Sequence, residues 1–453
     1  MTSLAKHSNK FLFLCITCFC QLAWADNSDS NALDYGFQLA IERSAFDGLS
    51  LGDEPDVDRL VEENFELEFK IEYSLSDNLY VFFTGALINE TETIETSGKE
   101  EKVSGLERKE MGIGYFFGES VQSELTLGRM EISSTSEWFL WWDEELDSAR
   151  LKSSFGNFET MLALAEEFTR ESTDDDFIDP ELKDVRRALL SLEWEVVADH
   201  SFIFYYLDQT DNSKSFNIGE TERVEKIDEE DADLSWNGIS YFGDFDLGSI
   251  GELEVELHTA RVSGDEIVYE YGDADAGRSE VEEREENRVR GTVQSYLFNW
   301  TPAALKDWQF IVGSARGSGD SNPDNRRVTS FRQTGLQDDS ESFGELYQPE
   351  LSNLKVDVIG VRWQVNESLQ LSLLSFDYQQ DKLADEMRDV GIDLDPSGLS
   401  RDLGNEIDLI VTIETTDGLE LILTAAEFNP GKAYGSFADE TSNYINLELV
   451  FEF

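Results

Sequence analysis

Residues 443–453 read NYINLELVFEF, and apolar side chains alternate there with mostly polar ones up to the end of the chain. Asn446, Glu448 and Glu452 share one parity, and the opposite parity is entirely apolar: Ile445, Leu447, Leu449, Phe451 and Phe453. Because successive side chains of a β-strand point to opposite faces, the pattern predicts a strand with one apolar and one acidic face. Such a strand fits either a soluble two-sheet protein or the wall of a transmembrane barrel, where the apolar face meets lipid.

The first 25 residues have the features of a secretory signal. Lys6 and Lys10 precede an apolar run, and residues 23–25 form the small-x-small cleavage site Ala-Trp-Ala. A membrane anchor is the alternative, but the run is shorter than the roughly 20 residues that a spanning helix needs. All three cysteines lie in this segment: Cys15, Cys18 and Cys20. We therefore expect an exported mature chain without disulfides, zinc-cysteine sites or cysteine nucleophiles.

The composition of the whole chain narrows the class of protein. Acidic residues number 96 against 35 basic ones, and the formal net charge of −61 excludes nucleic acid as a natural partner. No apolar stretch after residue 25 reaches the length of a membrane-spanning helix, and no linker divides the chain. We therefore expect one large domain over residues 26–453, which leaves a transmembrane barrel possible because barrel strands alternate.

Eighteen segments of alternating or apolar character follow one another along the chain. We expect strands at 34–45, 62–75, 78–91, 103–117, 121–132, 146–155, 158–168, 184–197, 200–209, 233–243, 251–262, 284–300, 307–317, 352–365, 368–381, 402–415, 418–428 and 441–453. Short connections with turn residues follow each even-numbered segment, and longer, charged connections follow each odd-numbered one. This predicts an all-β fold: a transmembrane antiparallel barrel of about 18 strands, with short periplasmic turns and long extracellular loops.

The second face of these strands supports a water-filled lumen. Residues 65–73 read FELEFKIEY, so charged side chains such as Glu68 and Lys70 occupy one face and need water. A soluble two-sheet protein would explain this alternation, but not the export signal combined with eighteen strands and a terminal Phe. Tryptophans near predicted strand ends fit interfacial girdles, although aromatic residues are common in any strand: Trp194, Trp236, Trp300, Trp308 and Trp363.

Several motifs resemble a known family. The final strand resembles the terminal signature of outer-membrane barrels, which end in Phe for recognition by the assembly machinery. Residues 125–156 (LTLGRMEISSTSEWFLWWDEELDSARLKSSFG) and the ordered motifs FRQTGLQ, ELSNL, LGNEIDL and FNPGKAYG are similar to the alginate export family of outer-membrane proteins. The resemblance runs from about residue 34 to the end of the chain. It implies an eighteen-stranded porin-like barrel that passes an anionic exopolysaccharide outward through an arginine-lined constriction.

The resemblance also implies which side chains line the path. By match to the family's motifs, the constriction would contain Arg129 and Arg150, with Arg316 and Arg332 as further candidates. The planar guanidinium stays charged and matches a carboxylate, which suits transient contact with a polyanion. The pleat also points Arg150 and Lys152 inward, because they alternate with apolar residues. Arg129 shares the parity of the apolar residues before it, so only a bulge or a strand end would turn it inward.

Each of these residues has a structural alternative. Arginines in barrel walls often pair with carboxylates, and Asp143 and Asp147 lie close to Arg150 in sequence. Trp141 and Trp142, with these two aspartates, could contact the sugar rings of a substrate, or they could anchor the loop at the membrane interface. We expect loops 133–145 and 318–351 to fold over or into the lumen, because they are long and rich in Gly, Asp and aromatic residues.

The acidic surplus conflicts with an anionic substrate. Acidic runs in the loops, such as STDDDFID, can be a solvated face adapted to high salt. Calcium binding by these loops is another possibility, although no run has the spacing of a known calcium loop. At seawater-like salt the Debye length falls to roughly 4 Å, so only charges at the constriction would steer a polymer. We expect no other cofactor.

An enzyme and a diffusion porin are the two other function classes. Catalysis usually needs a His beside a Ser or a carboxylate cluster, and after the signal only His200 and His258 are available, neither in a recognisable motif. We therefore expect no enzyme. A general or substrate-specific diffusion porin for small solutes or oligosaccharides remains the alternative, and unlike an exporter it needs no partner. For an exporter we expect a monomer in contact with outer-membrane lipid and lipopolysaccharide, supplied by a periplasmic scaffold and an inner-membrane synthase.

Overall fold

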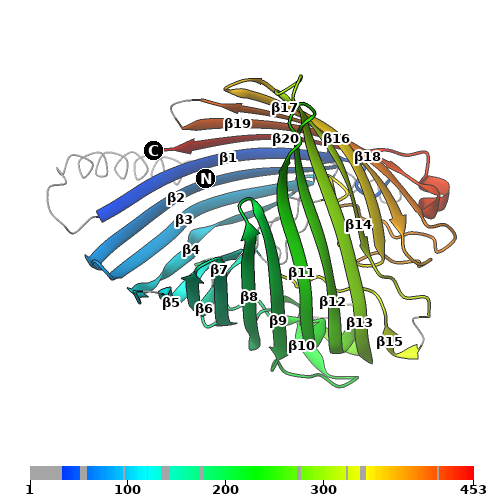
Figure 1. Ribbon diagram of the computed structural model, residues 1–453. Coiled ribbons are helices and arrows are strands. Elements are labelled where there is room, and N and C mark those ends of the chain that lie inside the picture. Colours follow the sequence, from blue (N-terminus) through cyan, green and yellow to red (C-terminus); the bar gives the residue numbers. More distant parts are fainter. Residues whose placement is uncertain are drawn as a thin grey trace, which may run out of the picture.

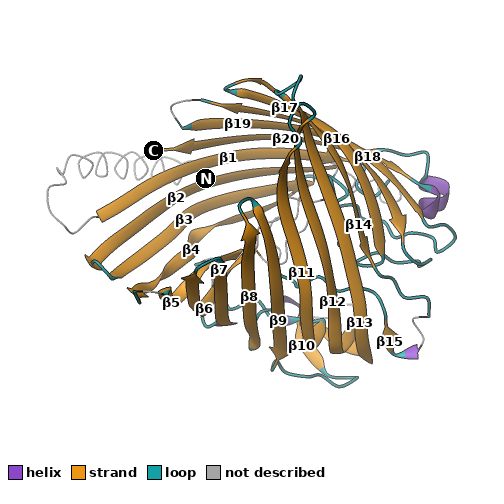
Figure 2. Ribbon diagram, in the orientation of Figure 1, coloured by secondary structure: helices purple, strands orange, loops and turns teal. Residues whose placement is uncertain are grey.

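The computed structural model describes residues 33–453 except 52–58, 95–96, 120, 134–142, 171, 174–176, 273–276, 323–324, 337–342, 389 and 416–417. The predicted signal at residues 1–25 lies outside the described residues. Figures 1 and 2 show a single curved sheet that closes on itself, with very little helix. The 3₁₀ turns include Val224–Lys226 and Lys432–Phe437.

The described residues form twenty strands in one sheet. Two are short pieces outside the wall, β10 (Thr221–Arg223) and β15 (Arg327–Val328). The others build the barrel: β1 (Leu33–Asp47), β2 (Arg59–Ser76), β3 (Leu79–Ile94), β4 (Lys99–Phe117), β5 (Gln122–Ser133), β6 (Asp143–Phe155), β7 (Phe158–Glu166), β8 (Val185–Val197), β9 (His200–Asp211), β11 (Glu230–Asp246), β12 (Gly251–Tyr271), β13 (Arg278–Pro302), β14 (Trp308–Gly317), β16 (Leu354–Asn366), β17 (Leu369–Gln380), β18 (Asp402–Glu414), β19 (Leu419–Pro430) and β20 (Ser442–Glu452). The predicted barrel of eighteen antiparallel strands is confirmed.

The last strand closes the barrel. β20 pairs with β19 on one side and with β1 on the other, so no wall strand keeps an open edge (Figure 1). Phe453 exchanges backbone hydrogen bonds of 3.0 and 2.9 Å with Phe37, and their rings stack with centroids 5.7 Å apart. Leu447 is exposed on the outside, and Glu448 points the other way. The terminal alternation therefore forms the seam between the two ends of the chain.

The exposed apolar row continues around the barrel and defines its outer face. Trp194 and Trp300 belong to this row, and Trp308 stacks on Trp363 with centroids 5.0 Å apart. The placement of Trp236 in an interfacial girdle was wrong, because its side chain points inward and is only 1% exposed. Its indole N–H donates to the carbonyl of Arg332, 2.8 Å away. Arg332 belongs to a chain segment that lies inside the barrel.

The lumen is filled by protein near the long loops. Most inward residues there are apolar, with a few buried carboxylates among them, and the apolar ones form one core with the segments that follow β14, β17 and β19: Leu207, Trp236, Val262, Phe331, Tyr347, Leu351, Phe376, Met387, Phe428 and Tyr434. The described part of loop 318–351 thus folds into the lumen, as the sequence predicted. The expectation of a water-filled lumen along the full barrel is therefore wrong for the half near the long loops.

β12 and β13 extend farther beyond the wall than predicted. Phe216 packs against Tyr269 and Val281 in a second apolar cluster, which supports the longer hairpin. Asp228 lies in the connection just before β11 and is only 5% exposed. Burial, together with Asp211 and Asp231, raises the pKa of Asp228 to about 7. Its ionisation at neutral pH therefore works against the folded loop.

We predict that Asp228→Asn stabilises loop 212–229 more at pH 8 than at pH 5. The folded pKa lies above the unfolded value near 3.8, so the contribution of the protonated carboxyl is complete below about pH 4 and is lost as pH rises to about 7. Hydrogen exchange of this loop, compared between variant and wild type at each pH, measures the effect. An equal difference at the two pH values would contradict the assignment.

Candidate functional site

The lumenal wall near the short turns is the surface that a solute would meet. Its inward row carries carboxylates from strands all around the barrel, among them Glu72, Glu124, Glu193, Glu254, Glu256 and Glu420. Arg362 is one of the few inward cations there, and its Nη1 donates to Gln309 at 3.0 Å. This part of the lumen therefore carries a negative field, broken by a small number of cations.

Arg150 lies in a lumenal hollow of about 410 Å³. The hollow is built from β1 to β6, and its charged and polar lining includes Lys70, Glu72, Tyr80, Glu110, Thr126 and Arg150. The Nη1 of Arg150 donates to the carbonyl of Glu131 at 2.8 Å, whereas its buried Nε has no hydrogen-bond partner among the described residues. Lys152 is the next inward residue on β6, directly opposite Glu124. The inward orientation of both cations agrees with the pleat.

Sequence reasoning did not single out Lys70. It lies in the polar row of FELEFKIEY on β2, and its Nζ is 3.1 Å from Glu68. The alternation already pointed its side chain inward, but only the closed barrel brings β2 to the same hollow as β6. Lys70 and Arg150 therefore place positive charge on two sides of the same hollow, in an otherwise acidic region.

Arg129 lies in a buried ion-pair network instead of this hollow. β4 and β5 keep a regular register up to Met111 opposite Arg129, so no bulge turns Arg129 inward. The side chain is 1% exposed, and its Nη1 is 2.8 Å from Glu167. Asp147 accepts two hydrogen bonds from Arg108, at 2.6 and 3.2 Å, and its own N–H donates to Glu167 at 3.1 Å. The four side chains connect β4, β5 and β6 to the segment after β7.

The other two predicted arginines also pair with carboxylates. Arg332 donates from Nε and Nη2 to Glu266 on β12, at 3.1 and 3.0 Å, and the Glu266 side chain is fully buried. Arg316 ends β14 in the outward row and donates from Nε to Asp381 at 2.8 Å. Burial by itself raises the pKa of Asp381, but the N–H of Gly319 and the Arg316 guanidinium lower it below its ordinary value. The Arg332–Glu266 pair holds the loop after β14 against the barrel, and Asp381 contacts the same loop by accepting the N–H of Gly319 at 3.1 Å.

A buried carboxyl group anchors this loop inside the lumen. The two oxygens of Glu406, on β18, accept the N–H groups of Leu346 and Tyr347, each at 2.9 Å. Gly344 has φ +112°, and a Cβ there would lie 2.4 Å from the Tyr378 hydroxyl, so glycine is required. Glu406 belongs to the motif LGNEIDL, yet its role was missed because nothing in sequence shows which loop fills the lumen.

Farther along this loop, aromatic contacts support the same anchor. The Tyr347 ring stacks on Phe428, with centroids 4.5 Å apart and an interplanar angle of 4°. The hydroxyls of Tyr347 and Tyr434 are 2.9 Å apart. The Tyr378 hydroxyl donates to the carbonyl of Phe343 at 2.6 Å. Loop 343–347 is therefore held by hydrogen bonds and by packed rings from β17, β19 and the turn before β20.

The remaining predicted contact residues lie in or beside a part of the chain that is not described. Trp141 and Trp142 lie outside the described residues, and Asp143 begins β6 without a described side chain. No group of three or more metal-binding side chains occurs in the described part of the chain. No helix among these residues is long and apolar enough to cross a membrane.

The two histidines belong to the wall. His200 is 2.8 Å from the Tyr241 hydroxyl. His258 lies between Ser240, at 2.8 Å, and Glu256, at 3.3 Å, which has the order of a hydrolytic triad. The hollow beside His258 measures only about 10 Å³, which holds at most one water molecule.

We predict that Glu406→Ala releases loop 343–351 from the lumen while leaving the barrel closed. Two hydrogen bonds to the carboxyl are lost, which costs about 1–3 kcal/mol and should accelerate hydrogen exchange of these amides roughly tenfold or more. Single-channel conductance should rise in the same variant.

Glu427→Ala on the neighbouring strand β19 is the matched control, since Glu427 is exposed and faces outward. Unchanged exchange and conductance in Glu406→Ala, equal to those of this control, would contradict the anchoring role.

Comparison with known proteins agrees with the barrel and its motifs. The family described as Alginate export matches residues 73–448. The chain is 26% identical over 428 residues to the alginate production protein AlgE of Pseudomonas aeruginosa. The match covers 82% of this chain and 82% of that protein. It is 23% identical over 381 residues to the protein of the same name from Azotobacter vinelandii, covering 72% and 73% of the two chains.

Solved structures support the fold independently. OccK8 (OprE) of Pseudomonas aeruginosa superposes with a TM-score of 0.56 at 11% identity, covering 93% of this chain and 98% of that chain. The outer membrane protein opdK of the same species gives a TM-score of 0.55 at 10% identity, with 93% and 99% covered. Identities this low support the fold alone. From the family match over residues 73–448, the chain belongs to the alginate export family of integral outer-membrane β-barrels.

Proposed function

We propose that this barrel passes an anionic, alginate-like polysaccharide outward through the outer membrane. The family gives the class of cargo, and the cations of the Arg150 hollow supply the recognition. The observation that carries the proposal is the position of the Arg150 guanidinium in the lining of this hollow without a described carboxylate to neutralise it. Arg150 has no carboxylate partner among the described residues, whereas Arg129, Arg316 and Arg332 each have one.

Passage of the polymer would be passive and would form no covalent bond. A uronate carboxylate would exchange its water for the guanidinium of Arg150 and then move on to Lys152 or Lys70, because each contact is short-lived in a wet lumen. The nearby Glu124 and Glu72 weaken each contact and so prevent tight retention of the polymer. Outward direction would come from continuous supply of polymer by an inner-membrane synthase and a periplasmic scaffold.

The acidic wall imposes the main barrier to this passage. Its carboxylates repel a polyanion at low salt, but exposed charges are screened beyond roughly 4 Å at seawater-like ionic strength. We therefore expect transport to depend on salt, with the cations of the hollow acting only at close range. The polymer must also displace loop 318–353, since this loop and its neighbours fill the extracellular half of the lumen.

A diffusion channel for small solutes is the second candidate. The predominance of inward carboxylates favours it, because such a wall would select cations or neutral sugars over polyanions. This channel would need neither the synthase nor the scaffold, and substitution of Arg150 would have little effect on its cargo. The two candidate functions therefore differ in the ion selectivity of the channel and in the effect of replacing Arg150 and Lys152 on the passage of the cargo.

We predict anion selectivity that depends on Arg150 and Lys152. In a planar bilayer under a potassium chloride gradient, the wild-type reversal potential should indicate anion preference, and Arg150→Ala with Lys152→Ala should shift it toward cation preference. Oligouronate added on the periplasmic side should block the wild-type current, with roughly tenfold weaker block in the double variant.

Arg43→Ala is the matched control, because Arg43 faces outward and pairs with Glu63 at 3.6 Å. It should leave both the reversal potential and the block unchanged. Cation selectivity in the wild type, insensitive to the double substitution, would overturn the export proposal and favour the diffusion channel.

A further inference from the structure

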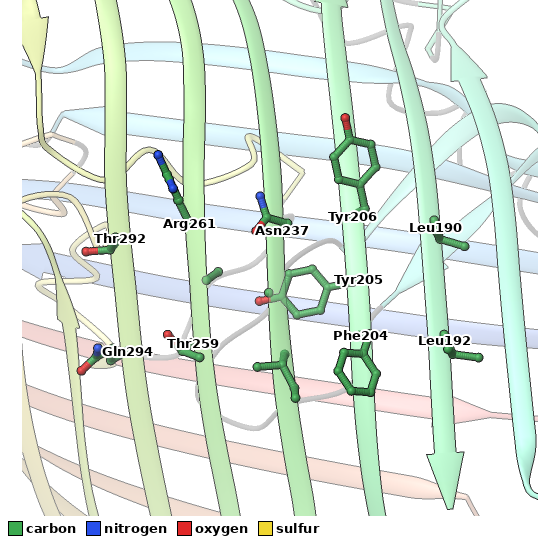
Figure 3. A pocket seen from close by; sticks show the side chains of 13 residues that line it. Leu190, Leu192, Phe204, Tyr205, Tyr206, Asn237, Thr259, Arg261, Thr292 and Gln294 are labelled. Carbon is green, nitrogen blue, oxygen red and sulfur yellow. The ribbon is translucent and has the colours of Figure 1, made fainter.

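A separate hollow lies on the outer face of the barrel. It has a volume of about 690 Å³ and spans β8, β9, β11, β12 and β13 (Figure 3). Most of its lining belongs to the outward row, because Arg261 has the parity of exposed Leu257 and lies opposite Thr292, which has the parity of exposed Tyr296. The inward neighbours Ala260 and Val262 are buried in the loop-filled core. The hollow therefore faces the membrane and not the lumen.

The lining changes from apolar to polar around the wall, from β8 and β9 toward β12 and β13. The apolar side consists of Leu190, Leu192, Phe204 and Ile239, and the polar side consists of Asn237, Thr259, Arg261, Thr292 and Gln294. Below it, exposed Leu257 and Tyr296 continue the apolar belt. The hollow thus lies at the upper edge of the lipid-facing belt, where acyl chains end and headgroups begin.

Arginine side chains cluster on this edge. Arg290 is two residues along β13 from Thr292, so it is a diagonal neighbour of Arg261 on the same face. Both arginines are exposed, and neither forms an ion pair with any described residue. Arg316 follows on β14 opposite Gln294, although it also binds Asp381.

Aspartates also lie near this cluster. Asp208 accepts the Tyr206 hydroxyl at 3.1 Å on β9, and Asp265 on β12 lies opposite Asp233 on β11 and opposite Arg288 on β13. A chain with a net charge of −61 therefore places unpaired positive charge at the lipid boundary of one sector. Such a surface is complementary to the phosphates of a lipid headgroup and not to the protein's own acidic surface.

We propose that this outer hollow binds a phosphorylated lipid of the outer leaflet, of the lipid A type. Its phosphates would lie between Arg261 and Arg290, its glucosamine hydroxyls against Asn237, Thr259 and Gln294, and an acyl chain along Phe204 and Leu190. A soluble anion would not use the apolar part of the hollow, whereas a lipid uses both parts. The proposal does not depend on what the lumen carries.

Native mass spectrometry of the full barrel, released from detergent micelles, tests this with bisphosphorylated lipid A as the probe. We expect a bound lipid on the wild type. Arg261→Ala with Arg290→Ala should weaken binding at least tenfold, since charge-assisted hydrogen bonds to phosphate are the stronger class. Arg261→Lys with Arg290→Lys should retain part of the affinity, which separates loss of charge from loss of fold. Arg43→Ala, an exposed outward arginine on β1, should bind like wild type.

Three results would overturn the proposal. The first is equal binding of lipid A by the wild type and the double alanine variant. The second is equal binding of lipid A from which both phosphates have been removed. The third is displacement of lipid A by oligouronate or by inorganic phosphate at millimolar concentration, which would assign the arginines to a soluble anion. The apparent Kd of each probe decides between these results and the expected one.

Discussion

The architecture depends on the pairing of β1 with β20. In a bilayer every backbone N–H and C=O must find a partner within the protein, so a sheet can span it only when its two edges meet. The hydrogen bonds of Phe37 with Phe453 and the stack of their rings complete that ring at the last residue of the chain. Closure also fixes the environment of each side chain, because one parity then faces lipid and the other faces the lumen.

Closure leaves a lumen that the chain itself partly fills. Near the extracellular loops the inward row is apolar, and it would be unstable against water, so it requires the segments that follow β14, β17 and β19. The carboxyl of Glu406 orients one of these segments by accepting two backbone N–H groups. A buried polar group of this kind specifies one loop position among many.

Charge is distributed differently over the three surfaces of the barrel. The lumenal wall is acidic with isolated cations at Arg150, Lys152 and Lys70. Within the wall and its loops, opposite charges pair closely, as in Arg129 with Glu167 and Arg332 with Glu266. Unpaired arginines appear at the outer lipid boundary instead. A net charge for the whole chain therefore says little about selectivity, which depends on the few groups nearest the path.

The amino-acid sequence by itself determined the strands and their two faces. Alternation has a period of two and is local, so it predicted eighteen strands, the outward Leu447 and the inward Arg150 and Lys152. The regular parity also indicated that Arg129 would face outward, which agrees with its register opposite Met111. The length and composition of loop 318–351 predicted that it folds over or into the lumen.

The partners of those side chains were decided only by the tertiary structure. Arg129 and Glu167, Arg332 and Glu266, and Glu406 and Leu346 are separated by 38, 66 and 60 residues. Local periodicity carries no information about contacts at such distances, because they depend on strand register, barrel closure and the course of the loops. For the same reason, Trp236 could be assigned to a strand end from its sequence, but not to a lumen that a distant loop makes apolar.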